Sequence, residues 1–342
     1  MLQKLGEIIL RRTFIWSQAK ARILSCPLIT TEGKEKIMKH GSRLLLVLFA
    51  GWLAVTPAFA EEIVGTLKKV KESGTITMGI RESSYPLSYL DDKQQPIGYH
   101  IDVCNEIVAA VKNQLKMSDL KVQHQPVTSQ NRIPLVSNGT VDIECGSTTN
   151  NEARQKQVAF ALTTFVTNVR MAVKKASGIT SLSQLDGKPV ATTSGTTSVQ
   201  LMRAHEKGNH IDFKEVYGKD HADSFLLLET DRAVAFVMDD NLLAGLITSS
   251  KKPQDYAIVG EVLNIEPIAI MVRKDDPAFK KVADDAIRGL EKSGELEKLY
   301  TKWFLSPIPP KNVNMNFAMS ETLKELIKNP SDAPAEAYNK KN

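Results

Sequence analysis

The sequence predicts an α/β protein with two lobes, each built on a doubly wound, mainly parallel sheet, and three observations indicate this. Strand-like and helix-like runs alternate along residues 66–304, the order that is typical of parallel sheets. The alternation occurs twice in succession, and a hydroxyl-rich segment follows a strand in each half. The 342 residues also leave room for about two domains of ordinary size.

The first lobe begins with a short helix that Gly74 ends. Its longest helix has apolar residues at three- and four-residue spacing, whereas its strands are short apolar or alternating runs. We expect helices at 66–73, 101–115 and 131–137, and strands at 75–80, 122–127 and 141–145.

The second half repeats the pattern, with strands expected at 168–174, 189–193, 213–217, 233–238, 257–259 and 268–273 and helices at 199–206, 224–230, 242–248, 277–290 and 296–304. We expect strand-like crossovers between the lobes near 167–173 and 266–273. The first lobe would then comprise 61–167 and 271–342, and the second lobe 168–270. The tail from Ser320 begins as an amphipathic helix and is expected to fray towards its polar end.

The N-terminal residues indicate export. From Met38 a short cationic segment leads into an apolar stretch that closes with a small-x-small pattern at Ala60, so residues 38–60 are predicted to be a signal peptide. A membrane anchor is the alternative, but the uncharged stretch 44–60 is shorter than the roughly 20 residues that span a bilayer. Residues 1–37 fit neither, and our hypothesis is that they are a mis-annotated extension and that translation starts at Met38.

Charge and cysteine content narrow the function classes. The net charge of +5 is concentrated at the N-terminus: residues 1–60 carry +6, and residues 61–342 carry −1. This balance gives no indication of a nucleic-acid partner. Beyond residue 60 there are two cysteines, Cys104 and Cys145, which in an oxidising compartment form a disulfide or remain buried thiols; the sequence leaves both open. No metal-ligand spacing occurs, and no cofactor is expected.

Two hydroxyl-rich segments predict the ligand site. Open parallel sheets bind ligands beyond the carboxyl ends of their strands. Residues 146–149 follow a strand of the first lobe, and residues 193–198 follow a strand of the second. Each precedes a helical segment, so backbone N–H groups and hydroxyls converge on a place that suits an anion. Matching segments in both lobes favour one ligand held between them over simple helix capping.

Charged side chains at other strand ends define the ligand further. Arg81, Arg132 and Arg154 each follow a different strand. His221 and Asp239 follow two further strands. Three guanidiniums, an imidazole and a carboxylate complement a ligand with two carboxylates and one ammonium. Glutamate and aspartate have this chemistry, and arginine binds carboxylates through two parallel hydrogen bonds that lysine cannot copy.

The chain from about residue 66 to 328 resembles the periplasmic solute-binding proteins, family 3, of polar amino-acid ABC importers, and within them the branch that binds glutamate and aspartate. The stretches that carry the resemblance are GIRESSYPLSY, TSQNRIPLVSNGTVDIECGSTTNNEARQKQVAF, TSGTTS, KDHADSF, RAVAFVMDDNLLAG and KWFLSPIPPKNVNMNF. It implies a type II periplasmic binding fold, a monomer whose lobes close on the ligand, and a membrane permease as partner.

The resemblance also implies a role for each site residue. Arg154, Thr149 and Thr197 would hold the α-carboxylate of the ligand, and Asp239 with Ser147 would take the α-ammonium. The side-chain carboxylate would be bound by Arg81, Ser129, Arg132 and His221. The sequence departs from the family at Ile268 and Ala269, where relatives often have an aromatic residue followed by glycine.

An enzyme on the same scaffold, such as a dehydratase, is the main alternative. It would need a general acid or base at the ligand, for which His221 and Glu144 are the candidates. The sequence contains no GxSxG motif, and His205 and His210 have the wrong spacing for a zinc helix. A periplasmic binding protein without enzymatic activity is therefore the preferred interpretation.

Overall fold

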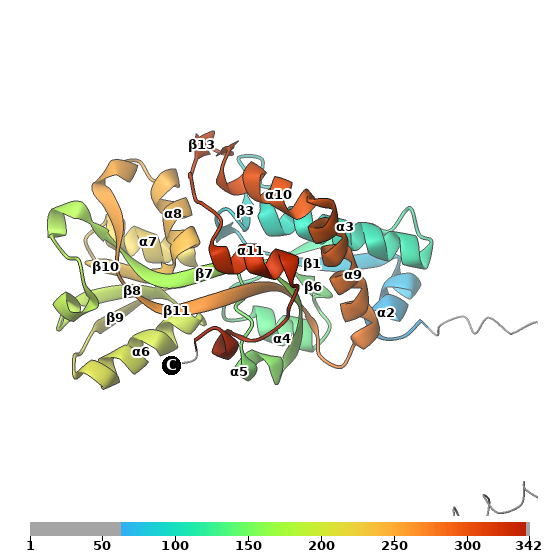
Figure 1. The fold of residues 1–342 in the computed structure, drawn as a ribbon, viewed down its shortest axis with the longest axis horizontal. Helices are drawn as coiled ribbons and strands as arrows, with labels where there is room; N and C mark the ends of the chain where they lie inside the picture. Colours follow the sequence, from blue (N-terminus) through green and yellow to red (C-terminus); the bar gives the residue numbers. More distant parts are fainter. Residues whose placement is uncertain (1–62, 340–342) are drawn as a thin grey trace, which may run out of the picture. The chain divides into compact units, whose positions relative to one another are not determined.

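Two long antiparallel strands, β7 (Val158–Lys174) and β11 (Tyr256–Arg273), run through the middle of the fold (Figure 1). The computed structural model describes residues 63–339. The predicted extension (1–37), the signal peptide (38–60) and its cleavage site after Ala60 lie outside these residues. Each of the two strands also pairs with a further strand on its other side, β7 with β10 and β11 with β6, so one continuous sheet extends outward from this pair in both directions.

Three parallel strands flank the pair on each side. The eight-stranded sheet has the order β5-β1-β6-β11-β7-β10-β8-β9. We call the part around β5, β1 and β6 the first lobe and the part around β10, β8 and β9 the second lobe. In each lobe the first strand in the sequence lies between the second and the third, which is the doubly wound arrangement. The bounds are β1 (Thr75–Ile80), β5 (Lys121–Pro126), β6 (Ile143–Glu144), β8 (Pro189–Thr193), β9 (Lys214–Gly218) and β10 (Ala235–Asp239).

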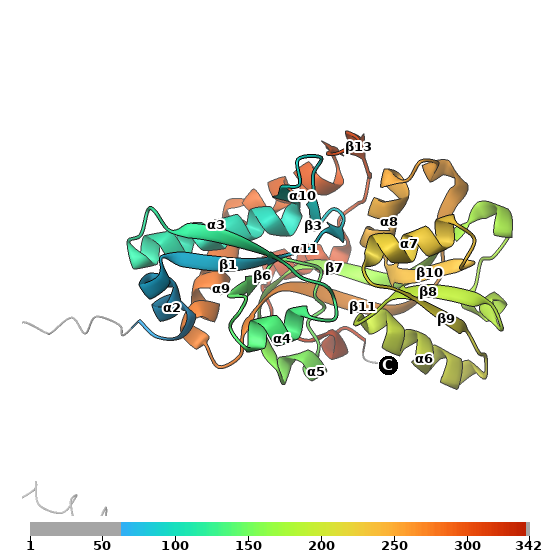
Figure 2. The same ribbon diagram turned by 180° about the vertical axis from the view of Figure 1, so that it is seen from behind.

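Helices cover both faces of each lobe. In the second lobe α6 lies on one face of the strands, and α7 and α8 lie on the other (Figures 1 and 2). In the first lobe α9 buries Phe279, Ala283 and Ile287 at helical spacing and packs against α3. The helices are α2 (Gly65–Ser73), α3 (Tyr99–Leu115), α4 (Arg132–Ser137), α5 (Glu152–Gln155), α6 (Thr197–Asn209), α7 (His221–Glu229), α8 (Asp240–Ser249), α9 (Pro277–Ser293), α10 (Glu295–Phe304) and α11 (Glu321–Lys328).

The described residues also form two smaller sheets. They are formed by β2 (Ser83–Ser84), β3 (Ser88–Leu90) and β4 (Pro96–Ile97), and by β12 (Pro307–Ile308) with β13 (Val313–Asn314). Within residues 63–339, no helix has the length and apolar character needed to cross a membrane.

The crossovers are longer strands than the sequence predicts. The expected strand 168–174 is the second half of β7, and the expected strands 257–259 and 268–273 are the two ends of β11. They are joined because β7 and β11 pair along nearly their whole length, with register shifts that include one between Val259 and Asn264. Two strands that pair with each other can continue through residues whose own sequence pattern does not predict a strand. The exact lobe boundaries stay a prediction.

The C-terminal tail is ordered, and the expectation of a frayed end is wrong for residues up to 339. The Ala335 N–H donates to the Asn150 carbonyl at 2.9 Å. Asn339 pairs with the backbone of Ile265 in β11 in both directions: its side-chain oxygen accepts the N–H at 2.9 Å and its amide donates to the carbonyl at 2.7 Å. The polar composition that suggested fraying instead serves hydrogen bonds to the strand between the lobes.

Candidate functional site

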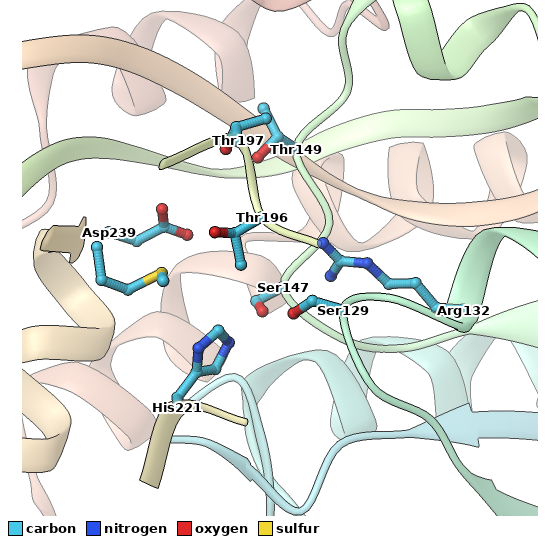
Figure 3. A pocket seen from close by; sticks show the side chains of 9 residues that line it. Ser129, Arg132, Ser147, Thr149, Thr196, Thr197, His221 and Asp239 are labelled. Atoms are coloured by element: carbon cyan, nitrogen blue, oxygen red, sulfur yellow. The ribbon is translucent and has the colours of Figure 1, made fainter. Parts of the chain in front are cut away.

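The strand ends of both lobes meet at a cavity (Figure 3). In doubly wound sheets, ligands bind where the strand order reverses. Here these points fall between β1 and β6 in the first lobe and between β8 and β10 in the second. The residues that line the cavity are Ser129, Arg132, Ser147, Thr149, Thr196, Thr197, His221, Met238 and Asp239.

Seven of the nine binding residues predicted from the sequence line this cavity. The other two, Arg81 and Arg154, are each hydrogen-bonded to residues that line it. Thr196 and Met238 line it as well and were not predicted, although Thr196 belongs to the hydroxyl-rich segment 193–198. The structure therefore gathers residues from strand ends that are far apart in the sequence around one space.

The segment 146–149 begins with glycine because a side chain has no room there. A Cβ atom added at Gly146 would overlap Glu144 Oε1 and lie 2.9 Å from Arg81 Cγ. Beyond the glycine, the Ser147 hydroxyl accepts a hydrogen bond from Arg81 Nη1 at 3.3 Å. The Thr148 hydroxyl donates to Glu144 Oε2 at 2.6 Å and so turns away from the cavity lining. The end of the strand thus packs directly against the side chain of Arg81, and Ser147 faces the cavity.

The corresponding segment of the second lobe touches the first lobe. Gly195 has a φ of 80°, and a Cβ atom added there would lie 2.7 Å from the Cα atom of Gln130. This contact lies beside Ser129, so the lobes are closed over the cavity. The next residues, Thr196 and Thr197, form the N-terminus of α6, where the first backbone N–H groups have no partner within the helix.

Arg132 is the strongest indication of an anionic ligand. It is the first residue of α4, its side chain is only 2% exposed, and its guanidinium points into the cavity (Figure 3). Among the described residues, its Nε and Nη1 atoms have no hydrogen-bond partner. Burial, together with the charges of Arg154 and Arg81, lowers the pKa of Arg132 to about 9, and Glu144 opposes this shift. A buried guanidinium with unfilled donors is costly unless an anion pairs with it.

Arg81 already has a partner within the protein. It follows β1 and is fully buried, and its Nη2 atom lies 2.5 Å from Asp220 Oδ1 of the second lobe. The same nitrogen lies 3.4 Å from His221 Nε2. Because arginine only donates, Nε2 must accept, and the proton of the neutral imidazole is then on Nδ1, 3.0 Å from the Thr193 hydroxyl. Burial, with the nearby Arg81 charge, lowers the pKa of His221 to about 3, so the ring is neutral near pH 7.

Asp239 faces the cavity from the end of β10 in the second lobe. Burial raises its pKa well above the usual range, and the neighbouring carboxylates of Glu266 and Asp240 raise it further, while Arg132 and Arg154 lower it. A carboxyl group in this position gains from a positive partner such as an ammonium.

Arg154 is hydrogen-bonded to the backbone of Thr149. The side chain of Asn151 caps α5 by accepting the Arg154 N–H at 2.9 Å, and Arg154 Nη1 donates to the Thr149 carbonyl at 2.9 Å. Burial lowers the pKa of Arg154, and the charges of Glu266 and Asp239 raise it.

A disulfide joins Cys104 of α3 to Cys145, so the structure contains the bridge that the sequence left open. His100 on the same helix makes a second link, since its Nδ1 atom lies 2.5 Å from the Gly146 carbonyl. Residues 63–339 contain no group of three His, Cys, Asp or Glu side chains that could hold a metal ion.

Comparison with protein-family models identifies the chain. Residues 76–306 match the family of bacterial extracellular solute-binding proteins, family 3. The chain belongs to this family. The resemblance inferred from the sequence is confirmed, and so is the predicted type II periplasmic binding fold.

Curated relatives of this solute-binding protein match it over nearly their full length. The "L-glutamate/L-aspartate-binding protein" of Pseudomonas aeruginosa is 50% identical over 300 residues, which cover 87% of this chain and 99% of the relative. The "Glutamate/aspartate import solute-binding protein" of Escherichia coli is 47% identical, with 87% and 98% covered. Among solved structures, an ancestral amino acid-binding protein described as a precursor of cyclohexadienyl dehydratase has a TM-score of 0.61 and 26% identity, covering 70% of this chain and 99% of that one.

Two carboxylates of this solute-binding protein were not among the predicted site residues. Asp220 precedes His221 and looks in the sequence like a helix cap, which it also is, since it accepts the His221 N–H. Glu266 belongs to the segment in which the sequence departs from its relatives. It is fully buried and accepts hydrogen bonds from Thr149 and Thr197. The signal in the sequence that could have drawn attention to Glu266 is the nearby departure from the family at Ile268 and Ala269.

Proposed function

We propose that this solute-binding protein captures L-glutamate or L-aspartate between its lobes and delivers it to the membrane permease of an ABC importer. The observation that carries the proposal is the pair of unfilled Arg132 donors across a closed cavity from Asp239. A ligand that satisfies both must present a carboxylate at one end and an ammonium at the other. The names of the Pseudomonas and Escherichia relatives support an acidic amino acid.

The positions of the side chains suggest how the ligand lies. Asp239 and Ser147 would take the α-ammonium. Thr149 and Thr197, with Arg154 behind them, would hold the α-carboxylate. Arg132, Ser129 and His221 would surround the side-chain carboxylate, with Arg81 held behind Ser147. A neutral His221 adds no charge to this end of the cavity.

The protein would act as a monomer in the periplasm after cleavage near Ala60. Family membership supports an extracytoplasmic location. N-terminal sequencing of the precursor and of the exported protein tests the cleavage site and the proposed start at Met38.

Titration calorimetry of the protein that begins at residue 61 tests the ligand. We expect binding of glutamate and aspartate and at least a hundredfold weaker binding of glutamine and asparagine, because the amides leave Arg132 without an anion. Equal affinity for glutamate and glutamine would refute the proposal. Lys188→Ala, a change at an exposed residue remote from the cavity lining, serves as the control.

The solved relative that is described as a dehydratase precursor favours one second candidate, an enzyme on the same scaffold. An enzyme would need a proton-transferring group at the ligand. His221 is a poor acid near pH 7 because its pKa is about 3, and Glu144 is not among the residues that line the cavity. We expect no turnover, and NMR of glutamate and aspartate incubated with the protein tests this, since any new product signal would favour the enzyme.

A further inference from the structure

One carboxylate oxygen joins the two lobes beside the cavity. Glu266 lies in β11, and its side chain is fully buried. Its Oε2 atom accepts hydrogen bonds from the hydroxyls of Thr149 at 2.5 Å and of Thr197 at 2.8 Å. Thr149 follows the last strand of the first lobe, whereas Thr197 begins α6 in the second. A single oxygen can hold both hydroxyls only while the lobes are closed.

Each threonine also has a backbone N–H group that these bonds do not use. Thr149 faces Ile268 of β11 as a pair flanked by the bonds from Asn150 N–H to Pro267 and from Ala269 N–H to Thr148. In such a pair the N–H of the central residue points away from the neighbouring strand. Thr197 is the first residue of α6, so its N–H has no partner within the helix. Both residues line the cavity, and their hydroxyls, bound to Glu266, leave these two N–H groups for a ligand.

The strand that carries Glu266 is held from two further directions. Asn264 donates from its amide to Glu266 Oε1 at 3.1 Å, which fills the second carboxylate oxygen. Ile265 is bound on both its N–H and its carbonyl by Asn339 of the C-terminal tail. The carboxylate is therefore fixed in place between the lobes. Burial lowers the pKa of Arg154, and the charge of Glu266 opposes this shift and so favours the charged guanidinium next to Thr149.

We propose that Glu266 is a positioning residue for closure: it draws the hydroxyls of Thr149 and Thr197 to one point so that their N–H groups bind the same carboxylate of the ligand. The inference rests on the proposed function in that it needs a ligand with a carboxylate. Glu266 does not touch the ligand. It couples the arrival of the second lobe to the completion of the anion site, which makes the closed liganded form more stable than the open one.

The test compares Glu266→Gln, Thr197→Val and the double variant with the parent protein. Titration calorimetry with L-glutamate gives the affinity, and nitroxide labels at the exposed residues Glu72 and Lys207, one in each lobe, report closure by pulsed electron spin resonance. Hydrogen bonds to charged groups predict that each single variant binds about 10- to 100-fold more weakly. The double variant should lose little more than either single variant, because both changes remove the same bond.

A role in folding alone would lower the melting temperature of the ligand-free protein without changing the fraction closed at saturating glutamate. We expect the opposite, a smaller closed fraction with little change in melting. Glu261→Gln is the matched control, the same change at an exposed position of β11, and should match the parent. Tighter binding by Glu266→Gln would overturn the inference, because Glu266 would then compete with the ligand, and so would unchanged binding and closure. A parent protein that binds no acidic amino acid would instead refute the proposed function.

Discussion

Arg81 and Asp220 form an ion pair across the cleft, with 2.5 Å between Nη2 and Oδ1. Arg81 follows β1 of the first lobe, and Asp220 directly precedes α7 of the second. Burial by itself would raise the pKa of Asp220, but the charge of Arg81 and the hydrogen bonds to the carboxylate lower it to about 2. The carboxylate is thus ionised throughout the neutral range, and the pair ties the N-terminus of α7 to the first lobe.

This pair predicts that Asp220→Asn weakens ligand binding although Asp220 is not among the residues that line the cavity. The variant leaves the buried Arg81 without its counter-charge in the closed form, and removing one partner of a buried pair is strongly destabilising. Because the Asp220 side chain is 16% exposed, we expect a loss of affinity on the order of tenfold, not the full effect of a dry pair. Titration calorimetry checks this, with the exposed Asp223→Asn of the same helix as control. Unchanged affinity would show that the pair does not contribute to closure.

Selectivity is expected to depend on Arg132 more than on Arg81. From the sequence alone, Arg81→Ala is predicted to erode the preference for acidic over amide side chains. We instead predict this role for Arg132, because Arg81 is paired with Asp220 and only its Nε atom has no partner, whereas Arg132 has two unfilled donors. Arg132→Gln should reduce the ratio of the glutamine to the glutamate dissociation constant by at least about tenfold. Arg154→Ala should abolish binding of both ligands.

The same calorimetry with glutamate and glutamine on the three variants separates these roles. An unchanged ratio in Arg132→Gln together with a reduced ratio in Arg81→Ala would restore the assignment made from the sequence.

The residues at strand ends were predictable because they depend on local order: a strand, a polar residue, then a helix. Arg132, Thr197 and Asp239 all follow this rule. Asp220 and Glu266 do not, because their partners lie 139 and 117 residues away, and no local pattern shows on which side of a turn or a crossover a carboxylate will lie. The continuous strands β7 and β11 were missed for a related reason. Each is extended by its pairing with the other, which the sequence of one segment does not contain.

The raised pKa of Asp239 leads us to predict that ligand binding releases protons. Burial and the neighbouring Glu266 and Asp240 carboxylates raise the pKa of Asp239, so its carboxyl group retains a proton at a higher pH than free aspartate. An ammonium next to it favours the ionised form and lowers the pKa. Binding therefore releases a proton at pH values between the two, and affinity rises with pH over that range.

Calorimetry of glutamate binding in buffers of different ionisation enthalpy measures the proton release directly. The observed enthalpy of the parent protein should depend on the buffer at pH values between the pKa of Asp239 without ligand and its pKa with ligand. Asp239→Asn, which cannot ionise, should bind weakly and show no such dependence. A buffer-independent enthalpy in the parent would contradict the prediction.

The disulfide between Cys104 and Cys145 links helix α3 to the segment 146–149 of the site. Both residues are fully buried, and the bridge ends one residue before Gly146, whose carbonyl also contacts His100 of the same helix. Burial lowers the pKa of His100 to about 4, so this second link is made by a neutral ring. Helix α3 thus fixes the segment that carries Ser147 and Thr149 by one covalent and one polar contact.

Replacing both cysteines by serine should therefore reduce stability and affinity together. The bridge closes a loop with a sequence separation of 41, for which the chain-entropy model gives about 4 kcal/mol of stabilisation. A loss of that size corresponds to a fall in melting temperature on the order of 10 °C for a domain of this length. Glutamate affinity should fall as well, because Ser147 and Thr149 lose their fixed position. Thermal melts and calorimetry of the Cys104→Ser/Cys145→Ser variant check both effects, and reductant should change the parent but not the variant. If the variant melts lower yet binds glutamate as tightly as the parent, the bridge stabilises the first lobe without positioning the site.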